Sequence, residues 1–258
     1  MDIEKLFHGE GGYIFVSHSH LDIKTVREIR NFLEEKGLEP ILFYLKSMDN
    51  ATEDKAELLT SLIHDEIDAR EFFLYINSDN AETSTWVQDE LNYVSGTAPH
   101  KIIRIDLKDG VESMKEKMGE LTKKLRIFIS CSGEDMELAE RVRAEFLRRD
   151  FRVYMPVQDM IPDTNYNESI MEEIAKAGGV LLLMTPRSVQ SKSVMQEIQY
   201  AYNRKAIIIP VIVGDVKLSF EWQIMLSMMQ CFRLKDEYDE QQVKRIVSDI
   251  RDCLMGDW

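Results

Sequence analysis

Short apolar runs recur along the chain and alternate with amphipathic stretches. Runs of four to six residues that are apolar at nearly every position are typical of strands covered on both faces by helices, as in a parallel sheet. We expect strands at residues 13–17, 42–45, 72–76, 102–105, 126–130, 151–155, 180–184, 207–212 and 231–234.

The stretches between these runs carry apolar residues at helical spacing. Val26, Ile29 and Leu33, for example, form one stripe of a helix after the first strand. Further helices are expected at residues 53–69, 85–95, 110–123, 166–177, 190–203 and 239–254. Strands that alternate with helices predict an α/β protein with a flavodoxin-like, doubly wound parallel sheet.

The pattern occurs twice. Tyr13–Ser17 and Arg126–Ser130 are similar apolar runs that end in serine, and each precedes a polar loop and an amphipathic helix. The spacing between Ser17 and Ser130 is that of a whole duplicated domain, because solenoid repeats are much shorter. We therefore predict two tandem domains, 1–123 and 124–258, the first with an abbreviated C-terminal edge.

Composition narrows the possible partners. The net charge of the 258 residues is −14, of which residues 1–123 carry −11 and residues 124–258 carry −3. A chain this acidic, without a basic run, is not expected to bind nucleic acid.

Composition also bears on the compartment. We expect no membrane partner, because no apolar run is long enough to span a bilayer and the N-terminus lacks an apolar signal core. Three cysteines without CxxC spacing indicate reduced thiols, with neither disulfides nor a zinc site. The expected location is the cytoplasm.

The doubly wound topology predicts where a site should lie. Ligands of such sheets bind beyond the carboxyl ends of the strands, where neighbouring crossovers diverge. With strand order 2-1-3-4, the loops Ser17–Asp22 and Asn77–Asn80 meet at that point in the first copy. The next helix carries Trp86 and Glu90 at positions i and i+4, on one face. Taken alone these two would be a rim packing residue and a solvated charge, but the topology places Glu90 at a cleft.

A metal site is the alternative for the first loop. His18 and His20 lie two residues apart beside Asp22, but the sequence offers no fourth ligand at a useful spacing. We expect Asp22 to cap the helix that follows, and we predict no metal.

The ordered set of motifs resembles the Toll/interleukin-1 receptor (TIR) domain, twice over and across nearly the whole chain. The resemblance rests on the strand 13–17 with its Ser-His-Ser-His-Leu-Asp continuation, on Ile127–Ser132 followed by Gly-Glu-Asp, on Ser84–Leu91 and on Ser193–Ile198. The Asp-containing loops after the second strands add to it.

The resemblance implies a chemistry. Many TIR domains cleave NAD+ at the nicotinamide–ribose bond, with a catalytic glutamate often in a W-x-x-x-E pattern that Trp86 and Glu90 match. The second copy has Glu197 but carries Ser193 in place of the tryptophan. NAD+ would be the substrate, no cofactor is implied, and Trp86 would contact the substrate. Ser17, His18 and Asn80 are further expected substrate contacts, chosen by position.

Two functions remain open from the sequence. One is an NAD+-cleaving signalling enzyme of bacterial type in anti-phage defence, and the other is a non-enzymatic scaffold that assembles with other TIR domains. The resemblance also implies that a neighbouring copy closes the site, either in cis through Asp159–Asn165 or through the same loop of another chain.

Overall fold

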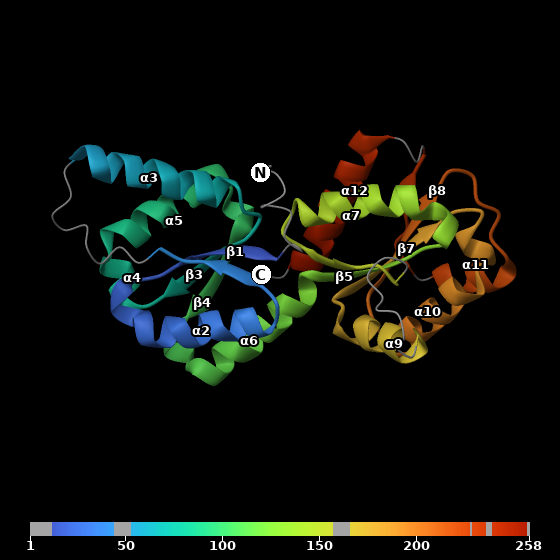
Figure 1. The fold of residues 1–258 in the computed structure, drawn as a ribbon, viewed down its shortest axis with the longest axis horizontal. Helices are drawn as coiled ribbons and strands as arrows, with labels where there is room; N and C mark the ends of the chain where they lie inside the picture. The colour runs from blue at the N-terminus through green and yellow to red at the C-terminus, as the bar shows by residue number, and fades with distance from the viewer. Residues whose placement is uncertain (1–11, 44–52, 157–165, 228, 236–238, 257–258) are drawn as a thin grey trace. The chain divides into compact units, whose positions relative to one another are not determined.

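The computed structural model describes residues 12–43, 53–156, 166–227, 229–235 and 239–256. The chain forms two compact units that divide between Thr122 and Lys123. Each unit is an all-parallel sheet with helices on both faces, which confirms the predicted doubly wound α/β class (Figure 1). The predicted loops with Asp49 and with Asp159–Asn165 lie outside the described residues.

The first unit has the strand order β2-β1-β3-β4, with helices α3 and α5 on one face of the sheet and α2 and α6 on the other (Figure 1). Its strands are β1 (Tyr13–Ser17), β2 (Glu39–Ile41), β3 (Phe73–Asn77) and β4 (Ile102–Asp106). Its helices are α2 (Ile23–Glu35), α3 (Glu53–Asp68), α4 (Asp79–Thr83), α5 (Thr85–Thr97) and α6 (Val111–Lys124).

The second unit adds a fifth strand, in the order β6-β5-β7-β8-β9. Its strands are β5 (Arg126–Ser130), β6 (Arg152–Tyr154), β7 (Gly179–Met184), β8 (Ile208–Val213) and β9 (Phe232–Leu234). Its helices are α7 (Met136–Leu147), α9 (Tyr166–Lys176), α10 (Lys192–Asn203), α11 (Phe220–Leu226) and α12 (Glu240–Met255). Helices α9 and α10 lie together on one face and α7 and α12 on the other (Figure 1).

The two units bury the same core positions. In each, one cluster joins the first and third strands to the helix before the third strand and the helix after it. The matched residues are Phe15 and Phe128, Ile63 and Ile170, Ile67 and Ile174, Phe73 and Val180, Val87 and Val194, and Val94 and Ala201. Every pair beyond the first strand has the same sequence separation, so that one constant offset relates the third strands of the two copies and the helices on either side of them.

The predicted second strand of the first copy, residues 42–45, is misplaced: Leu42 and Phe43 are not in a strand, and residues 44–45 lie outside the described residues. The strand is Glu39–Ile41, which pairs in parallel with Tyr13–Phe15. Pro40 lacks a backbone N–H, but β2 is the edge of the sheet and pairs on one side only, so the strand tolerates the proline. Phe43 packs instead against Phe15, with ring centroids 5.9 Å apart.

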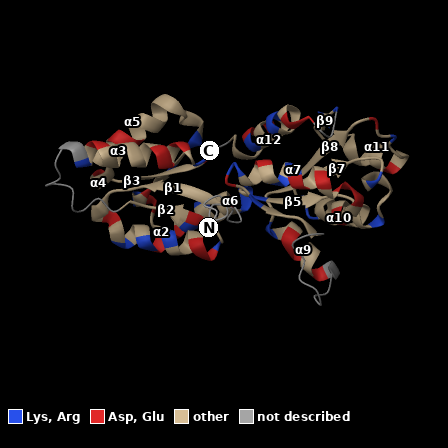
Figure 2. Ribbon diagram, turned by 45° about the horizontal axis from the view of Figure 1, so that its top comes forward, with Lys and Arg blue, Asp and Glu red and all other residues tan. Residues whose placement is uncertain are grey.

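The described parts of the chain show where the charges lie, the state of the cysteines and the character of the helices. Acidic residues recur on the helices of both units (Figure 2). All three cysteines are free thiols. In the parts of the chain that the structure describes, every helix is too short or too polar to cross a membrane.

Candidate active site

Glu90 lies on the buried side of α5. Ser84 caps the helix by accepting a hydrogen bond from the Val87 backbone N–H, and Val87 and Val94 both face the core. Glu90 falls between them at i+3 from Val87, so that the helix turns its side chain toward the sheet and leaves it only 6% exposed. A freely solvated surface charge is therefore ruled out for this residue.

The carboxylate of Glu90 meets the end of the first strand. Ser17, the last residue of β1, is buried, and its Oγ donates a hydrogen bond of 2.5 Å to Glu90 Oε2. The contact joins two residues that are 73 positions apart in the chain. It places the carboxylate at the carboxyl edge of the sheet, where the topology predicts a site.

The second copy repeats this contact. Ser130 ends β5, and its Oγ donates a hydrogen bond of 2.6 Å to Glu197 Oε2 on α10. Glu197 is 7% exposed. The serine–glutamate pair is therefore a property of both domains, although the tryptophan of the first copy becomes Ser193 in the second.

Burial controls the ionisation of both carboxyl groups. It raises the pKa of Glu90 from 4.5 to about 7, and the negative charge of Asp89 adds to this rise. Burial likewise raises the pKa of Glu197 from 4.5 to about 7. The hydrogen bond from the strand-terminal serine opposes the shift in each case, because it favours the charged form. Each group can therefore gain or lose its proton close to neutral pH.

A second acidic residue ties the neighbouring loops together. Asp22 accepts hydrogen bonds from Ser78 Oγ (2.5 Å) and from Asn80 Nδ2 (2.7 Å). Asp22 is the N-cap residue of α2, as predicted, but its side chain makes no capping hydrogen bond to that helix. The carboxylate instead connects the loop after β1 with the segment that follows β3, where it binds Ser78 and Asn80.

The second copy builds the same connection with different residues. Asp135 is buried and accepts hydrogen bonds from Thr185 Oγ1 (2.6 Å) and from Arg187 Nε (2.5 Å). The constant offset between the copies aligns Arg187 with Asn80, so a neutral amide in the first copy becomes a guanidinium in the second. The acidic anchor is common to both copies, and among the described residues its charge is balanced by an ion pair in the second copy but not in the first.

Two other predicted contact residues, His18 and Trp86, are close in sequence to the serine and the glutamate of this pair. His18 follows Ser17 and is buried, with Nδ1 3.2 Å from the Val16 carbonyl oxygen. Its burial lowers the pKa of the imidazole, which favours the neutral ring at pH 7. Trp86 is half-buried, one turn before Glu90 on α5. At the position of His18 the second copy carries Cys131, and burial raises the pKa of that thiol to about 12.

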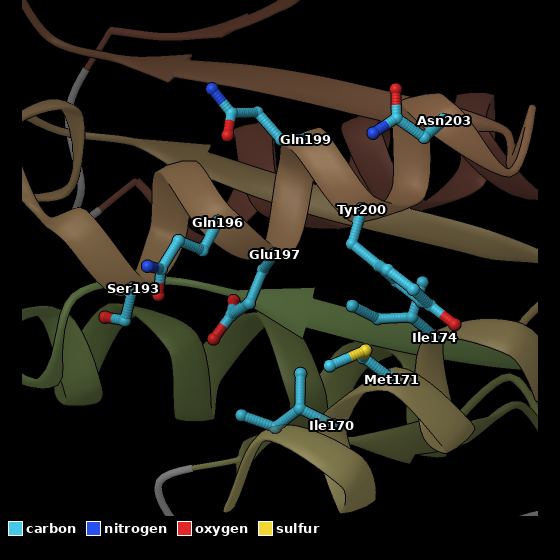
Figure 3. Close-up of a pocket in the computed structure, with 9 residues that line it drawn as sticks. All are labelled: Ile170, Met171, Ile174, Ser193, Gln196, Glu197, Gln199, Tyr200 and Asn203. Atoms are coloured by element: carbon cyan, nitrogen blue, oxygen red, sulfur yellow. The ribbon is translucent and has the colours of Figure 1, made fainter.

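A pocket adjoins the glutamate of the second copy. It has a volume of about 280 Å³ and lies between α9 and α10 (Figure 3). Figure 3 shows Glu197 and Tyr200 pointing from α10 toward α9, where Met171 and Ile174 face them. The lining residues are Ile170, Met171, Ile174, Ser193, Gln196, Glu197, Gln199, Tyr200 and Asn203.

These features define a class of protein: a duplicated doubly wound domain with a serine-bound glutamate at the carboxyl edge of each sheet. The chain belongs to the TIR domain family, whose model matches residues 14–120 and 127–247. It is thus a tandem TIR domain protein, as the motifs predict.

Two solved structures are similar to this chain. The TIR domain of the Toll-related receptor TRR-2 from Hydra magnipapillata is 19% identical, covers 48% of this chain and 97% of its own, and has a TM-score of 0.41. The Flv1 flavodiiron core from Synechocystis is 11% identical, covers 69% of this chain and 49% of its own, and has a TM-score of 0.37. A search among curated protein sequences found no match.

Three features of the site were not predicted from the sequence. They are the pairing of each glutamate with the strand-terminal serine, the loop connection through Asp22 and Asp135, and the pocket beside Glu197. A signal for the first two was present, since serine ends the first strand in both copies and an aspartate follows it at the same spacing in both. The pocket had no such signal, because it depends on which side chains meet across two helices.

Proposed function

We propose that this chain cleaves NAD+ at the nicotinamide–ribose bond, and that Glu90 is the catalytic carboxylate, with Glu197 as its counterpart in the second copy. The observation that carries the proposal is the buried carboxylate that a strand-terminal serine holds at the carboxyl edge of each sheet. Burying a carboxylate is costly, and groups with strongly perturbed pKa values cluster at functional sites. The choice of NAD+ as the substrate comes from the TIR family, many members of which cleave it.

The chemistry needs one carboxylate. When the bond between C1′ of the ribose and the pyridinium nitrogen breaks, its electron pair neutralises the nicotinamide, which leaves without a general acid. The ribose becomes an oxocarbenium-like cation, and an ionised glutamate beside it stabilises the developing positive charge. Water then adds to C1′ and loses a proton, which gives ADP-ribose. The product would serve as a signal in bacterial defence.

The test is nicotinamide release from NAD+ by the purified full-length chain. Glu90→Gln keeps the size and the hydrogen-bonding capacity of the side chain but removes its charge, so we expect turnover to fall roughly a hundredfold or more. Glu197→Gln measures how much of the turnover comes from the second copy. Glu82→Gln, at an exposed position on α4, is the matched control and should leave turnover unchanged. Turnover that survives both site variants together would refute the assignment.

A scaffold is the second candidate, and exposed apolar pairs favour it. Leu58 and Leu62 lie one turn apart on α3 with exposed fractions of 63% and 51%, and Phe220 and Ile224 on α11 have fractions of 76% and 58%. Helix faces of this kind mark protein–protein contacts. In this role the chain would assemble with other TIR domains.

Sedimentation velocity tests the scaffold role. Serine at both positions of either apolar pair should weaken self-association, whereas Lys24→Ser/Glu28→Ser, an exposed pair on α2, should not. A wild-type chain that stays monomeric at every concentration, with NAD+ turnover intact, would exclude assembly as the primary role.

A further inference from the structure

The segment that follows the third strand carries different charges in the two copies. By the constant offset, Asp79 and Asn80 of the first copy correspond to Pro186 and Arg187 of the second. One acidic side chain is lost and one guanidinium is gained, so this segment is more positive by two charges in the second copy. It leaves the sheet at the carboxyl edge, where doubly wound domains bind their ligands.

The change of charge continues on the next helix. Asp89, beside Glu90, corresponds to the neutral Gln196. Burial is the larger cause of the raised pKa of Glu90, and the charge of Asp89 adds to it, whereas among the described residues no acidic neighbour adds to the raised pKa of Glu197. The loop after the first strand gains one acid in the second copy, Glu134, but this side chain is exposed. The carboxyl edge of the second sheet is therefore the more positive of the two.

Arg187 lies at the same edge of the sheet as the glutamate. Its Nε donates a hydrogen bond of 2.5 Å to Asp135 Oδ1. Burial raises the pKa of the Cys131 thiol to about 12, and the charges of Glu197 and Asp135 add to this rise, so both carboxylates lie close to one residue. Ser130, which binds Glu197, is the residue before that cysteine. The guanidinium and the buried glutamate thus belong to one site.

The loop fixes the arginine while leaving its side chain partly exposed. Thr185 Oγ1 accepts hydrogen bonds from the backbone N–H groups of Arg187 (3.1 Å) and Ser188 (3.0 Å). The same hydroxyl donates one to Asp135 (2.6 Å). The side chain of Arg187 is 45% exposed, whereas that of Asp135 is fully buried. A guanidinium has five N–H donors in a planar fork, so one group can bind an aspartate through Nε and an anionic ligand through another edge.

We propose that Arg187 is a specificity-determining residue, which makes the second copy favour a dinucleotide with an additional phosphate monoester, NADP+, over NAD+. This inference rests on the proposed function for its dinucleotide ligand, but not on cleavage of that ligand. In doubly wound dinucleotide sites an arginine accommodates the 2′-phosphate of NADP+, and guanidinium–phosphate pairs are frequently bidentate. The first copy, with Asp79 and Asn80 at these positions, should favour NAD+.

Isothermal titration calorimetry with NADP+ and with NAD+ tests the proposal on the full-length Glu90→Gln/Glu197→Gln chain, in which neither ligand should be consumed. Arg187→Asn introduces the amide of the first copy, so that Asp135 keeps a hydrogen-bond donor. NADP+ binding should weaken roughly tenfold and NAD+ binding by less than about twofold, because the lost hydrogen bond is one to a charged phosphate. Arg245→Asn removes the same charge from an exposed position on α12, and should change neither affinity.

The reverse substitution does not depend on the fold of the second domain. Asn80→Arg places a guanidinium beside Asp22, which accepts hydrogen bonds at the position of Asp135. Added to the Arg187→Asn chain, it should tighten NADP+ binding roughly threefold or more without tightening NAD+ binding. A thermal melt checks that each variant is folded. Equal losses for the two ligands in a folded Arg187→Asn chain, or no gain from Asn80→Arg, would overturn the proposal.

Turnover of both dinucleotides by the chain with its glutamates intact separates this inference from the proposed function. If NADP+ binds in the expected way but nicotinamide is never released, only the enzyme proposal fails. If nicotinamide is released from NADP+ and NAD+ in a ratio that Arg187→Asn leaves unchanged, only the specificity proposal fails. A chain that binds neither dinucleotide would overturn both.

Discussion

At the residue scale, the central feature is a carboxylate kept close to its point of ionisation. Glu90 and Glu197 are surrounded by protein, yet each has one serine hydroxyl that favours its charged form. Burial outweighs that hydrogen bond, and both pKa values stand at about 7. The site can therefore present an anion to a cationic ribose without holding a permanent, fully desolvated charge.

This ionisation has a stability consequence. A carboxyl group whose pKa is raised by folding stabilises the folded state below pH 4.5, and that stability is lost as the pH rises from 4.5 through about 7. Glu90→Gln should therefore be more stable than the wild type at pH 8.5, by up to about 3 kcal/mol, and should lose most of that advantage at pH 4.5. Urea denaturation at both pH values measures the difference.

The control for this prediction is Glu82→Gln, at an exposed position on the same domain. Its stability relative to the wild type should not vary with pH. A Glu90→Gln advantage that is the same at both pH values would show that the gain does not come from ionisation.

Ser17 should also influence the pKa of Glu90. Ser17→Ala removes the donor that favours the ionised form of Glu90, so the pKa of the carboxyl group should rise further. If the ionised form is the active one, the midpoint of the pH profile of nicotinamide release should move up by roughly one pH unit. A lower rate with an unchanged midpoint would assign the serine a merely structural role.

At the element scale, the loops after the first and third strands are joined by an aspartate in both copies. The first copy uses neutral donors on Asp22, whereas the second sets the guanidinium of Arg187 on the buried Asp135. Removing one partner of a buried charge costs more than removing a neutral donor from a half-buried one.

Matched substitutions compare the two connections. Arg187→Ala should destabilise the second domain by about 1–3 kcal/mol, and Asn80→Ala should cost the first domain about 1 kcal/mol or less. Thermal unfolding followed by calorimetry on the full chain gives both values. Equal costs at the two positions would mean that the ion pair with Asp135 adds nothing beyond a hydrogen bond.

The sequence pattern was sufficient to predict most helices and strands, but not the edge strand β2 or the side-chain contacts of the site. Periodicity located the long helices because each buries one face, and continuous apolar runs located the central strands because these are buried at nearly every position. The pattern misplaced β2 because the apolar run lies at residues 42–45, whereas the strand is the shorter and less apolar segment Glu39–Ile41. The repeat located Glu90 and Glu197, but the serine–glutamate bond joins residues 73 and 67 positions apart, which no local pattern encodes.

At the scale of the whole molecule, the duplication has produced two related sites rather than two equal ones. Both copies retain the core, the serine–glutamate pair and the aspartate anchor. They differ at the tryptophan, which is Trp86 in the first and Ser193 in the second, and at His64, which becomes Met171 in the second.

The pH dependence of nicotinamide release from NAD+ tests the account most directly. The full-length chain should show turnover that falls about tenfold per pH unit well below pH 7 and levels off above it, because the ionised glutamate is the active form. Glu90→Gln should remove this pH-dependent turnover, while Glu82→Gln should reproduce the wild-type profile. An absence of turnover at every pH, or a profile that Glu90→Gln and Glu197→Gln together leave unchanged, would contradict the account.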